Sequence, residues 1–290
     1  MTRRHDMKTK KSLMRRAAIH LLWLSICPLL SNAQNEASAV EDIEPVDPRP
    51  AQSDVASMQL IKNYLTVTGG RQAHLALRNA VAAGTIKEST LVRNFRLIET
   101  IDGKRHLTYD WTHLGRKHRV VYVHDGLQSW TQVLEPKRQE PRTYGGADGA
   151  HFASQRWLLQ PFTLPLLANY VFKYQGASKV SGRPAYIVKG YGKKDAHSWF
   201  YFDKEKSLLT RWGGEGQIAG VSEYMDYRAT QFKPVDGVLL PTRIDLLVEN
   251  AAFGHLNFEK IEMNQNLDDV SFLIPRSTIP TLRQRPITSK

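Results

Sequence analysis

The residues that could carry out chemistry start with the histidines, because histidine is a common general base and metal ligand. All but His5 and His20 lie beyond residue 33. They are His74, His106, His113, His118, His124, His151, His197 and His255. The sequence contains no HExxH motif and no H-x-x-x-H pair with a nearby carboxylate. His113, His118 and His124 are close in sequence, so a metal site is one alternative there, but we expect exposed strand or loop positions.

Two short segments of the chain have residue types that could indicate a catalytic or phosphate-binding site. Asp268 and Asp269 resemble paired carboxylates, but they stand directly before the apolar residues 270–275, which favours a turn or a cap. Residues 213–216 (GGEG) lack the Lys-Ser/Thr pair of a phosphate-binding loop and should form a turn between strands. No G-x-S-x-G motif is present, so no nucleophilic serine is predicted. We expect no catalytic residue, no metal ligand and no cofactor, hence no enzyme; an unrecognised hydrolase of lipid or glycan is the alternative.

The elements that would position a binding site are mostly strands. From residue 82 onward apolar and polar residues alternate, as in residues 95–101 and 107–111. Turn residues such as Asp102-Gly103 recur between these segments. The pattern predicts roughly ten strands in one antiparallel sheet.

A few segments have helical character instead. A helix is expected at residues 54–66. Ser53 or Asp54 can cap its start, and Gly69 and Gly70 stop it from continuing. The apolar face expected for this helix consists of Val55, Met58, Ile61 and Leu65. Further helices are expected at 71–77 and 150–159, a loop at 136–149, and an apolar segment broken by proline at 162–170. The fold class is therefore α+β, a single domain of helices over a strongly curved antiparallel sheet.

The N-terminal region has the pattern of an exported protein. Residues 1–16 are basic, residues 17–30 are mostly apolar, and residues 31–33 offer a small-residue cleavage site. This pattern predicts a secretory signal peptide at 1–33, because the apolar run is too short to span a bilayer. We therefore expect a periplasmic protein, either free or peripheral to a membrane.

The rest of the chain divides by composition. Residues 34–54 are acidic and contain prolines, which predicts a flexible tether. The domain is expected at 55–276, followed by a tail at 277–290. Cys27 is the only cysteine and lies in the predicted signal peptide, so the mature domain must be held by its core rather than by disulfides.

The charge of the chain excludes one class of partner. The net charge of +12 includes seven basic residues and one acidic residue of the predicted signal peptide. Without them 33 basic and 27 acidic residues remain, a net charge of +6. An excess this modest does not indicate a nucleic-acid-binding protein. It suits either weak attraction to anionic lipid or an ordinary solvated surface.

The aromatic residues suggest a binding surface. Trp111, Trp130, Trp157, Trp199 and Trp212 are spread over the predicted sheet and the middle helix. A single aromatic residue at strand spacing usually belongs to the core. Together, however, the sheet carries more apolar residues than one helical layer needs to cover, and excess apolar surface favours a ligand site.

Several stretches together resemble the LolA/LolB-like family of lipoprotein carriers and sorting proteins, which includes sensor domains of RseB type. The stretches are residues 64–70 (YLTVTGG) with 75–84, 123–130 (VHDGLQSW), 201–211 (YFDKEKSLLTR), 227–228 (YR) with 235–241 (VDGVLLP), and 266–272 (NLDDVSF) with Pro275. The resemblance covers about residues 55–275. It implies an unclosed half-barrel of about eleven antiparallel strands, lidded by helices, whose apolar cavity accepts the acyl chains of lipoproteins or a similar lipid. The family's carriers are not enzymes.

The leading hypothesis is thus a periplasmic lipid-binding or lipoprotein-sorting protein that works as a monomer. The residues expected to line its cavity from the sheet are Leu107, Tyr109, Trp111, Val121, Val123, Trp130, Phe200 and Phe202. Those expected from the lid are Trp157, Leu158, Leu164 and Leu167. A shift of one residue in register would move a strand's side chains to the other face.

The alternative hypothesis is an envelope sensor or scaffold domain. It would bind an inner- or outer-membrane protein through a sheet edge or through residues 162–170, with a filled core beneath.

Overall fold

The computed structural model describes residues 50–154, 156–163, 166–192, 197–218, 221–248, 250–268 and 270–275. The predicted signal peptide, most of the tether, the C-terminal tail and the predicted lid residue Leu164 lie outside the described residues. The domain boundaries therefore stay predictions.

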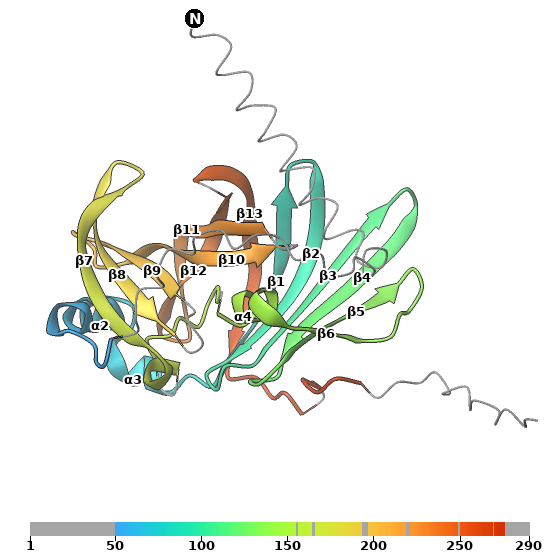
Figure 1. Cartoon of the computed structure of the whole chain (residues 1–290), viewed down its shortest axis with the longest axis horizontal. Coiled ribbons are helices and arrows are strands. Elements are labelled where there is room, and N and C mark those ends of the chain that lie inside the picture. Colours follow the sequence, from blue (N-terminus) through green and yellow to red (C-terminus); the bar gives the residue numbers. More distant parts are fainter. Residues whose placement is uncertain are drawn as a thin grey trace, which may run out of the picture. The chain divides into compact units, whose positions relative to one another are not determined.

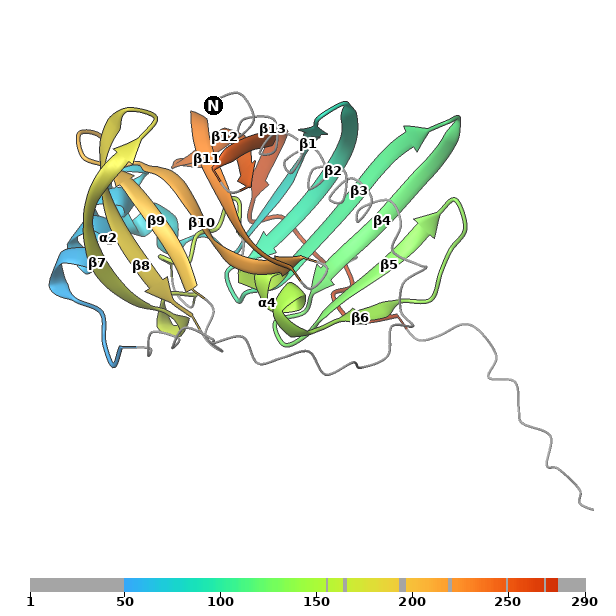
Figure 2. The same ribbon diagram turned by 45° about the horizontal axis from the view of Figure 1, so that its top comes forward.

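The described residues form one antiparallel sheet of 13 strands that does not close (Figure 1). In chain order the strands are β1 (Asn79–Glu88), β2 (Leu91–Thr100), β3 (Arg105–His113), β4 (Arg116–His124), β5 (Ser129–Glu135), β6 (Arg142–Tyr144), β7 (Val171–Val180), β8 (Arg183–Tyr191), β9 (His197–Asp203), β10 (Leu209–Ile218), β11 (Val221–Val235), β12 (Val238–Val248) and β13 (Ala251–Met263). Neighbours in sequence are neighbours in the sheet, except that β1 pairs with β13 in the middle and leaves β6 and β7 as the edges. Figure 2 shows how strongly the sheet bends.

The expected count of about eleven strands was too low. β6 lies within residues 136–149, whose polar composition predicted a loop, and β10 runs through residues 213–216, which predicted a turn. A Cβ atom at Gly213 would lie 2.2 Å from the Met225 carbonyl oxygen of β11. The glycine therefore permits two strands to approach closely, a role that composition does not distinguish from a turn.

The part of the chain that the structure describes contains few helices. They are α2 (Val55–Val67), α3 (Gly70–Leu75), α4 (Gly146–Ser154) and the short 3₁₀ turn η1 (Leu166–Asn169). α2 contacts β7, α3 contacts β12, and α4 contacts β10, β5 and β4. α4 was expected at 150–159; it ends earlier, so Trp157 and Leu158 lie in the segment that follows it.

α2 is the helix that the sequence predicted best. Asp54 is its N-cap, with its Oδ1 accepting a hydrogen bond of 2.7 Å from the Ser57 N–H. The helix ends at Thr68, where Gly69 adopts a φ of 129° and lies so close to the Gly237 carbonyl that a side chain would not fit.

The N-terminus of α2 also protects an edge of the sheet. The second carboxylate oxygen of Asp54 accepts a hydrogen bond of 2.9 Å from the Tyr174 N–H of edge strand β7. Ser53 Oγ accepts one of 2.9 Å from the Phe172 N–H, and Ser57 Oγ donates one of 2.9 Å to the Phe172 carbonyl. These contacts satisfy edge groups that would otherwise be open to another strand.

A buried carboxylate holds the segment after α4 on the sheet. Glu99 of β2 is fully buried and accepts backbone hydrogen bonds from Trp157, Leu158 and Leu159, at 2.9, 3.1 and 2.9 Å. The Nε atoms of Arg105 and Arg156 lie 3.5 and 3.8 Å from its oxygens. A buried charge is tolerated only when it is paired and hydrogen-bonded in this way. The sequence gives no signal for this cluster.

The main core lies between this segment, the helices and one face of the sheet. Phe162 packs with ring centroids 4.9 Å from Phe200, 5.6 Å from Phe202 and 5.7 Å from Phe172. Tyr64 of α2 reaches the same rings. The helix, the segment after α4 and strands β7 and β9 are thereby joined through aromatic contacts.

We predict that Glu99→Ala lowers the free energy of unfolding by about 3–5 kcal/mol, because Arg105 and Arg156 would remain buried without a counter-charge. Denaturant unfolding followed by circular dichroism measures the change. Glu259→Ala, at an exposed position of β13, is the matched control and should change stability by less than about 0.5 kcal/mol. Equal effects of the two substitutions would contradict the role given to Glu99.

We predict that Asp54→Ala lowers the free energy of unfolding by about 1 kcal/mol at pH 7, because it removes a helix cap. Burial alone would raise the pKa of Asp54, but the backbone hydrogen bonds from Ser57 and Tyr174 outweigh burial, and the pKa is lowered. The contribution of the carboxylate is therefore complete above pH of about 4 and is lost as the pH falls further. Unfolding curves of the unaltered protein and the variant should converge in acid. Asp268→Ala, at an exposed position, serves as the control.

Candidate functional site

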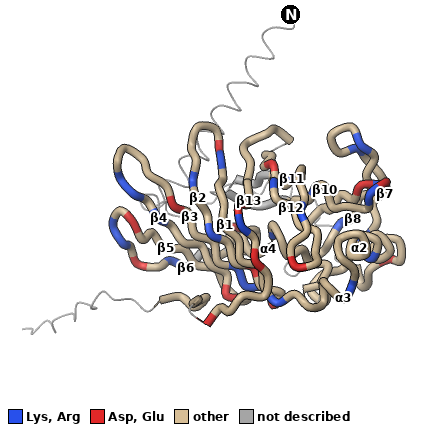
Figure 3. Tube along the Cα trace, turned by 180° about the vertical axis from the view of Figure 1, so that it is seen from behind, with Lys and Arg blue, Asp and Glu red and all other residues tan. Residues whose placement is uncertain are grey.

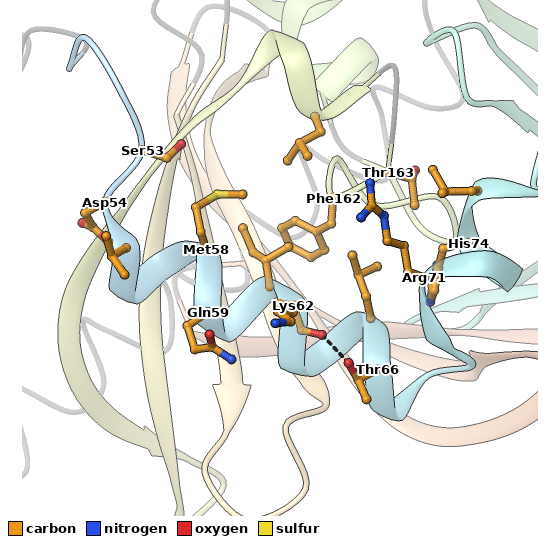
Figure 4. Close-up of a pocket in the computed structure, with 15 residues that line it drawn as sticks. Ser53, Asp54, Met58, Gln59, Lys62, Thr66, Arg71, His74, Phe162 and Thr163 are labelled. Carbon is orange, nitrogen blue, oxygen red and sulfur yellow. Dashed lines mark hydrogen bonds between the residues drawn. The ribbon is translucent and has the colours of Figure 1, made fainter.

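A surface groove with a volume of about 570 Å³ runs along α2 (Figure 4). Its walls come from α2, from α3 and from Phe162, Thr163 and Leu167 in the segment after α4. Volumes of this size are typical of sites for small molecules.

The lining of the groove is largely apolar. It includes Val55, Met58, Ile61, Leu65, Leu75, Phe162 and Leu167. Ile61 and Phe162 are buried and form the base, whereas Val55, Met58 and Leu75 are 87%, 36% and 49% exposed. Figure 4 shows Met58 facing the Phe162 ring. Several apolar side chains gathered in one concave surface indicate a binding site rather than scattered surface residues.

The helical pattern explains part of this arrangement. The face predicted for α2 was Val55, Met58, Ile61 and Leu65, but the buried residues of the helix are Ser57, Ile61 and Tyr64. The helix packs on the core through a face that shares Ile61 with the predicted one but is rotated toward Ser57 and Tyr64. Val55 and Met58 therefore remain at the surface. Their helical spacing predicted a face packed on the core, whereas the structure places them in the groove.

His74 lies at the end of the groove and is buried. Thr68 Oγ1 donates its only proton to the Tyr64 carbonyl at 2.7 Å, so the 2.8 Å contact with His74 requires the histidine Nε2–H to donate. Burial lowers the pKa of His74. The ring is therefore neutral at pH 7 and contributes a hydrogen bond to the fold rather than a charge to the groove.

Most of the predicted ligand-lining residues lie in the core instead of this groove. Leu107, Tyr109, Trp157, Leu158, Phe200 and Phe202 are buried in the main cluster, and Trp111 packs partly buried against it. Leu167 lines the groove, and Leu158 lines a crevice of only about 10 Å³. The residues predicted to line a ligand site did not include Met58, Leu75 or Phe162, which line the groove. A role of the core residues in binding stays a prediction.

Three predicted residues lie on the opposite face of the sheet. Val121, Val123 and Trp130 form a separate apolar cluster, against which Phe272 and Ile274 of the C-terminal segment (residues 270–275) pack. The Trp130 Nε1–H donates a hydrogen bond of 2.9 Å to the Phe272 carbonyl. Leu107 pairs with Tyr122, so Val121 and Val123 must point the other way. These residues do not share a cavity with Leu107 and Tyr109.

His106 belongs to the same opposite face. Its ring makes an edge-on contact with Phe272, with centroids 6.3 Å apart. Burial, with a further effect of the nearby Arg96 charge, lowers the pKa of His106 to about 4. The neutral ring therefore suits the contact with the C-terminal segment, and its protonation opposes that contact.

The described residues show neither a metal cluster nor a helix suited to a membrane. No group of three or more His, Cys, Asp or Glu side chains in this part of the chain is arranged to hold a metal ion. His113, His118 and His124 therefore do not combine into such a site. None of the described helices has the length and apolar character needed to cross a bilayer.

The chain is similar in structure to LolA superfamily proteins. One solved match is a LolA superfamily protein from Nitrosomonas europaea, with 10% identity and a TM-score of 0.48 over 73% of this chain and 96% of that one. Another, described as an outer membrane lipoprotein-sorting protein domain from Vibrio parahaemolyticus, has 12% identity and a TM-score of 0.49 over 74% of this chain and 94% of that one. A third match is the MucA/MucB complex structure from Pseudomonas aeruginosa, with 12% identity and a TM-score of 0.22 over 73% of this chain and 58% of that one.

No protein-family model matches the sequence, and no curated protein matches it. The similarity to the solved structures lies in the fold.

We predict that His106 makes stability depend on pH. Its folded-state pKa lies below the ordinary value of about 6.5, so the unfolded chain takes up the proton first. The contribution is complete above pH of about 6.5 and is lost as the pH falls toward about 4. Urea unfolding at several pH values should show a steeper loss for the unaltered protein than for His106→Gln. His113→Gln, at an exposed position, is the matched control, and an identical pH dependence of all three proteins would contradict the prediction.

Proposed function

We propose that this protein binds the acyl chain of a lipid in the groove formed by α2, α3, Phe162, Thr163 and Leu167. The observation that carries the proposal is the groove of about 570 Å³ whose apolar residues Val55, Met58 and Leu75 remain at the surface. A solvent-exposed surface rarely keeps several apolar side chains together unless a ligand or partner covers them.

The energetics suit a hydrocarbon chain. Each methylene group removed from water contributes about 0.8 kcal/mol. A few buried methylene groups would therefore begin to offset the cost of association, which is about 4–15 kcal/mol. This contribution has no direction, so binding of this kind needs no catalytic side chain. Non-catalytic binding is the activity we assign.

The cellular role belongs to the same proposal. The signal-peptide pattern of residues 1–33 supports a periplasmic location of the mature protein, and the family resemblance of residues 55–275 favours sorting or carriage of outer-membrane lipoproteins. The acyl chains of a lipoprotein would then be the ligand, and the membrane proteins that hand over or receive the lipoprotein would be the partners.

The scaffold alternative has less support from the packing. Phe162 and Leu166, in the segment expected to dock a partner, are buried. The edge strand β7 is partly occupied by Ser53 and Asp54. Both features reduce the surface that this hypothesis requires.

Leu75→Gln tests the proposal, because it places a polar side chain without charge in the apolar wall, at a position that is 49% exposed. We expect the affinity for a fluorescent fatty-acid probe to fall by at least about tenfold, which corresponds to about 1.4 kcal/mol. Leu127→Gln is the matched control, because Leu127 is 90% exposed in the β4–β5 turn.

The control variant should bind the probe like the unaltered protein, and both variants should keep the sheet signal in circular dichroism. Equal affinities for all three proteins would remove the groove as the acyl site. Native mass spectrometry of protein from a periplasmic extract should also show bound lipid.

A further inference from the structure

We propose that the lipid accepted by the groove carries an anionic head group, and that Lys62 and Arg71 hold that group. This inference rests on acyl binding in the groove and specifies which class of lipid binds there. It comes from the charges along the walls of the groove.

The two helices that form the groove carry only positive charges. Between Val55 and Leu75 the chain contains Lys62 and Arg71 and no acidic residue. On the rest of the domain, basic and acidic residues are interspersed along the strands (Figure 3). Both cations line the groove and both are exposed. Figure 4 shows Arg71 extending from α3 toward Thr163 and Phe162.

Neither cation is neutralised by the fold. Within the described part of the chain, no ion pair joins Lys62 or Arg71 to a carboxylate. The acidic side chain in the groove wall is Asp54, which lies about 12 Å from Lys62 along the helix axis at 1.5 Å per residue. Both Asp54 oxygens already accept backbone hydrogen bonds, from Ser57 and Tyr174. Among the described residues, the positive charge at this end of the groove is therefore uncompensated.

This arrangement matches the two parts of an amphiphile. The apolar base suits the hydrocarbon chain, and the cationic rim suits an oxygen-rich anion where the chain emerges. An arginine guanidinium can bind phosphate or carboxylate through two parallel hydrogen bonds, and a lysine supplies a compact charge. The neutral ring of His74 adds no charge, so the selectivity depends on Lys62 and Arg71.

A pair of ligands that differ only in the head group tests the inference. Lysophosphatidate and monoacylglycerol with the same palmitoyl chain, both below their micelle concentrations, would compete for the fluorescent fatty-acid probe. We expect the phosphate to improve the affinity of the unaltered protein by about tenfold. Palmitate, whose carboxylate offers the same chemistry, should also bind better than the neutral ligand. Salt of about 0.5 M should reduce the advantage, because these charges are exposed and screened.

The double variant Lys62→Gln and Arg71→Gln should lose most of the preference for the anionic ligand while still binding monoacylglycerol. Lys206→Gln, at an exposed position in the β9–β10 turn, is the control and should keep the preference. Circular dichroism confirms that each variant is folded.

The outcomes separate the two proposals. If none of the ligands binds, acyl binding itself is wrong. If anionic and neutral ligands bind equally and the double variant changes nothing, acyl binding stands and the head-group inference is overturned. If a peptide of the acidic residues 36–47 binds the groove and no lipid does, the occupant is the chain's own segment, and both proposals fail.

Discussion

The buried carboxylate of Glu99 is the interaction on which the arrangement of this domain depends. A charge removed from water must find hydrogen bonds and counter-charges within the protein. Glu99 finds them in the backbone N–H groups of residues 157–159 and in two arginines. The chain that follows α4 is thereby fixed across β2, and Phe162 is brought to the place where it packs against Phe200 and forms the base of the groove.

The position of α2 completes the groove. At its N-terminus Ser53 and Asp54 are tied to edge strand β7, and at its C-terminus the Leu239 N–H donates a hydrogen bond of 2.9 Å to the Thr68 carbonyl. A helix fixed at both ends cannot turn about its axis to bury all of its apolar residues. Val55 and Met58 stay at the surface for this reason, and the same contacts that protect a sheet edge leave apolar surface for a ligand.

The prediction of individual site residues shows where sequence reasoning ends. Leu107, Tyr109, Phe200 and Phe202 were correctly recognised as apolar and strand-like, but the structure buries them in the core. Val121 and Val123 have the same character and lie on the other face. Alternation reveals which residues share a face within one strand, but the relation between strands depends on register, which is decided by pairing across the sheet. The Glu99 cluster was not predictable, because its members meet only in the folded chain.

The amino-acid sequence by itself determined the class of the fold, the start and end of α2 and the hairpin turn at Asp102-Gly103. These features depend on local signals, namely alternation, caps and glycines. Tertiary structure decided the thirteen-strand count, the two faces of the sheet and the location of the groove. Those features depend on which surfaces remain after distant segments have packed, and burial is a property of the whole chain rather than of any stretch of it.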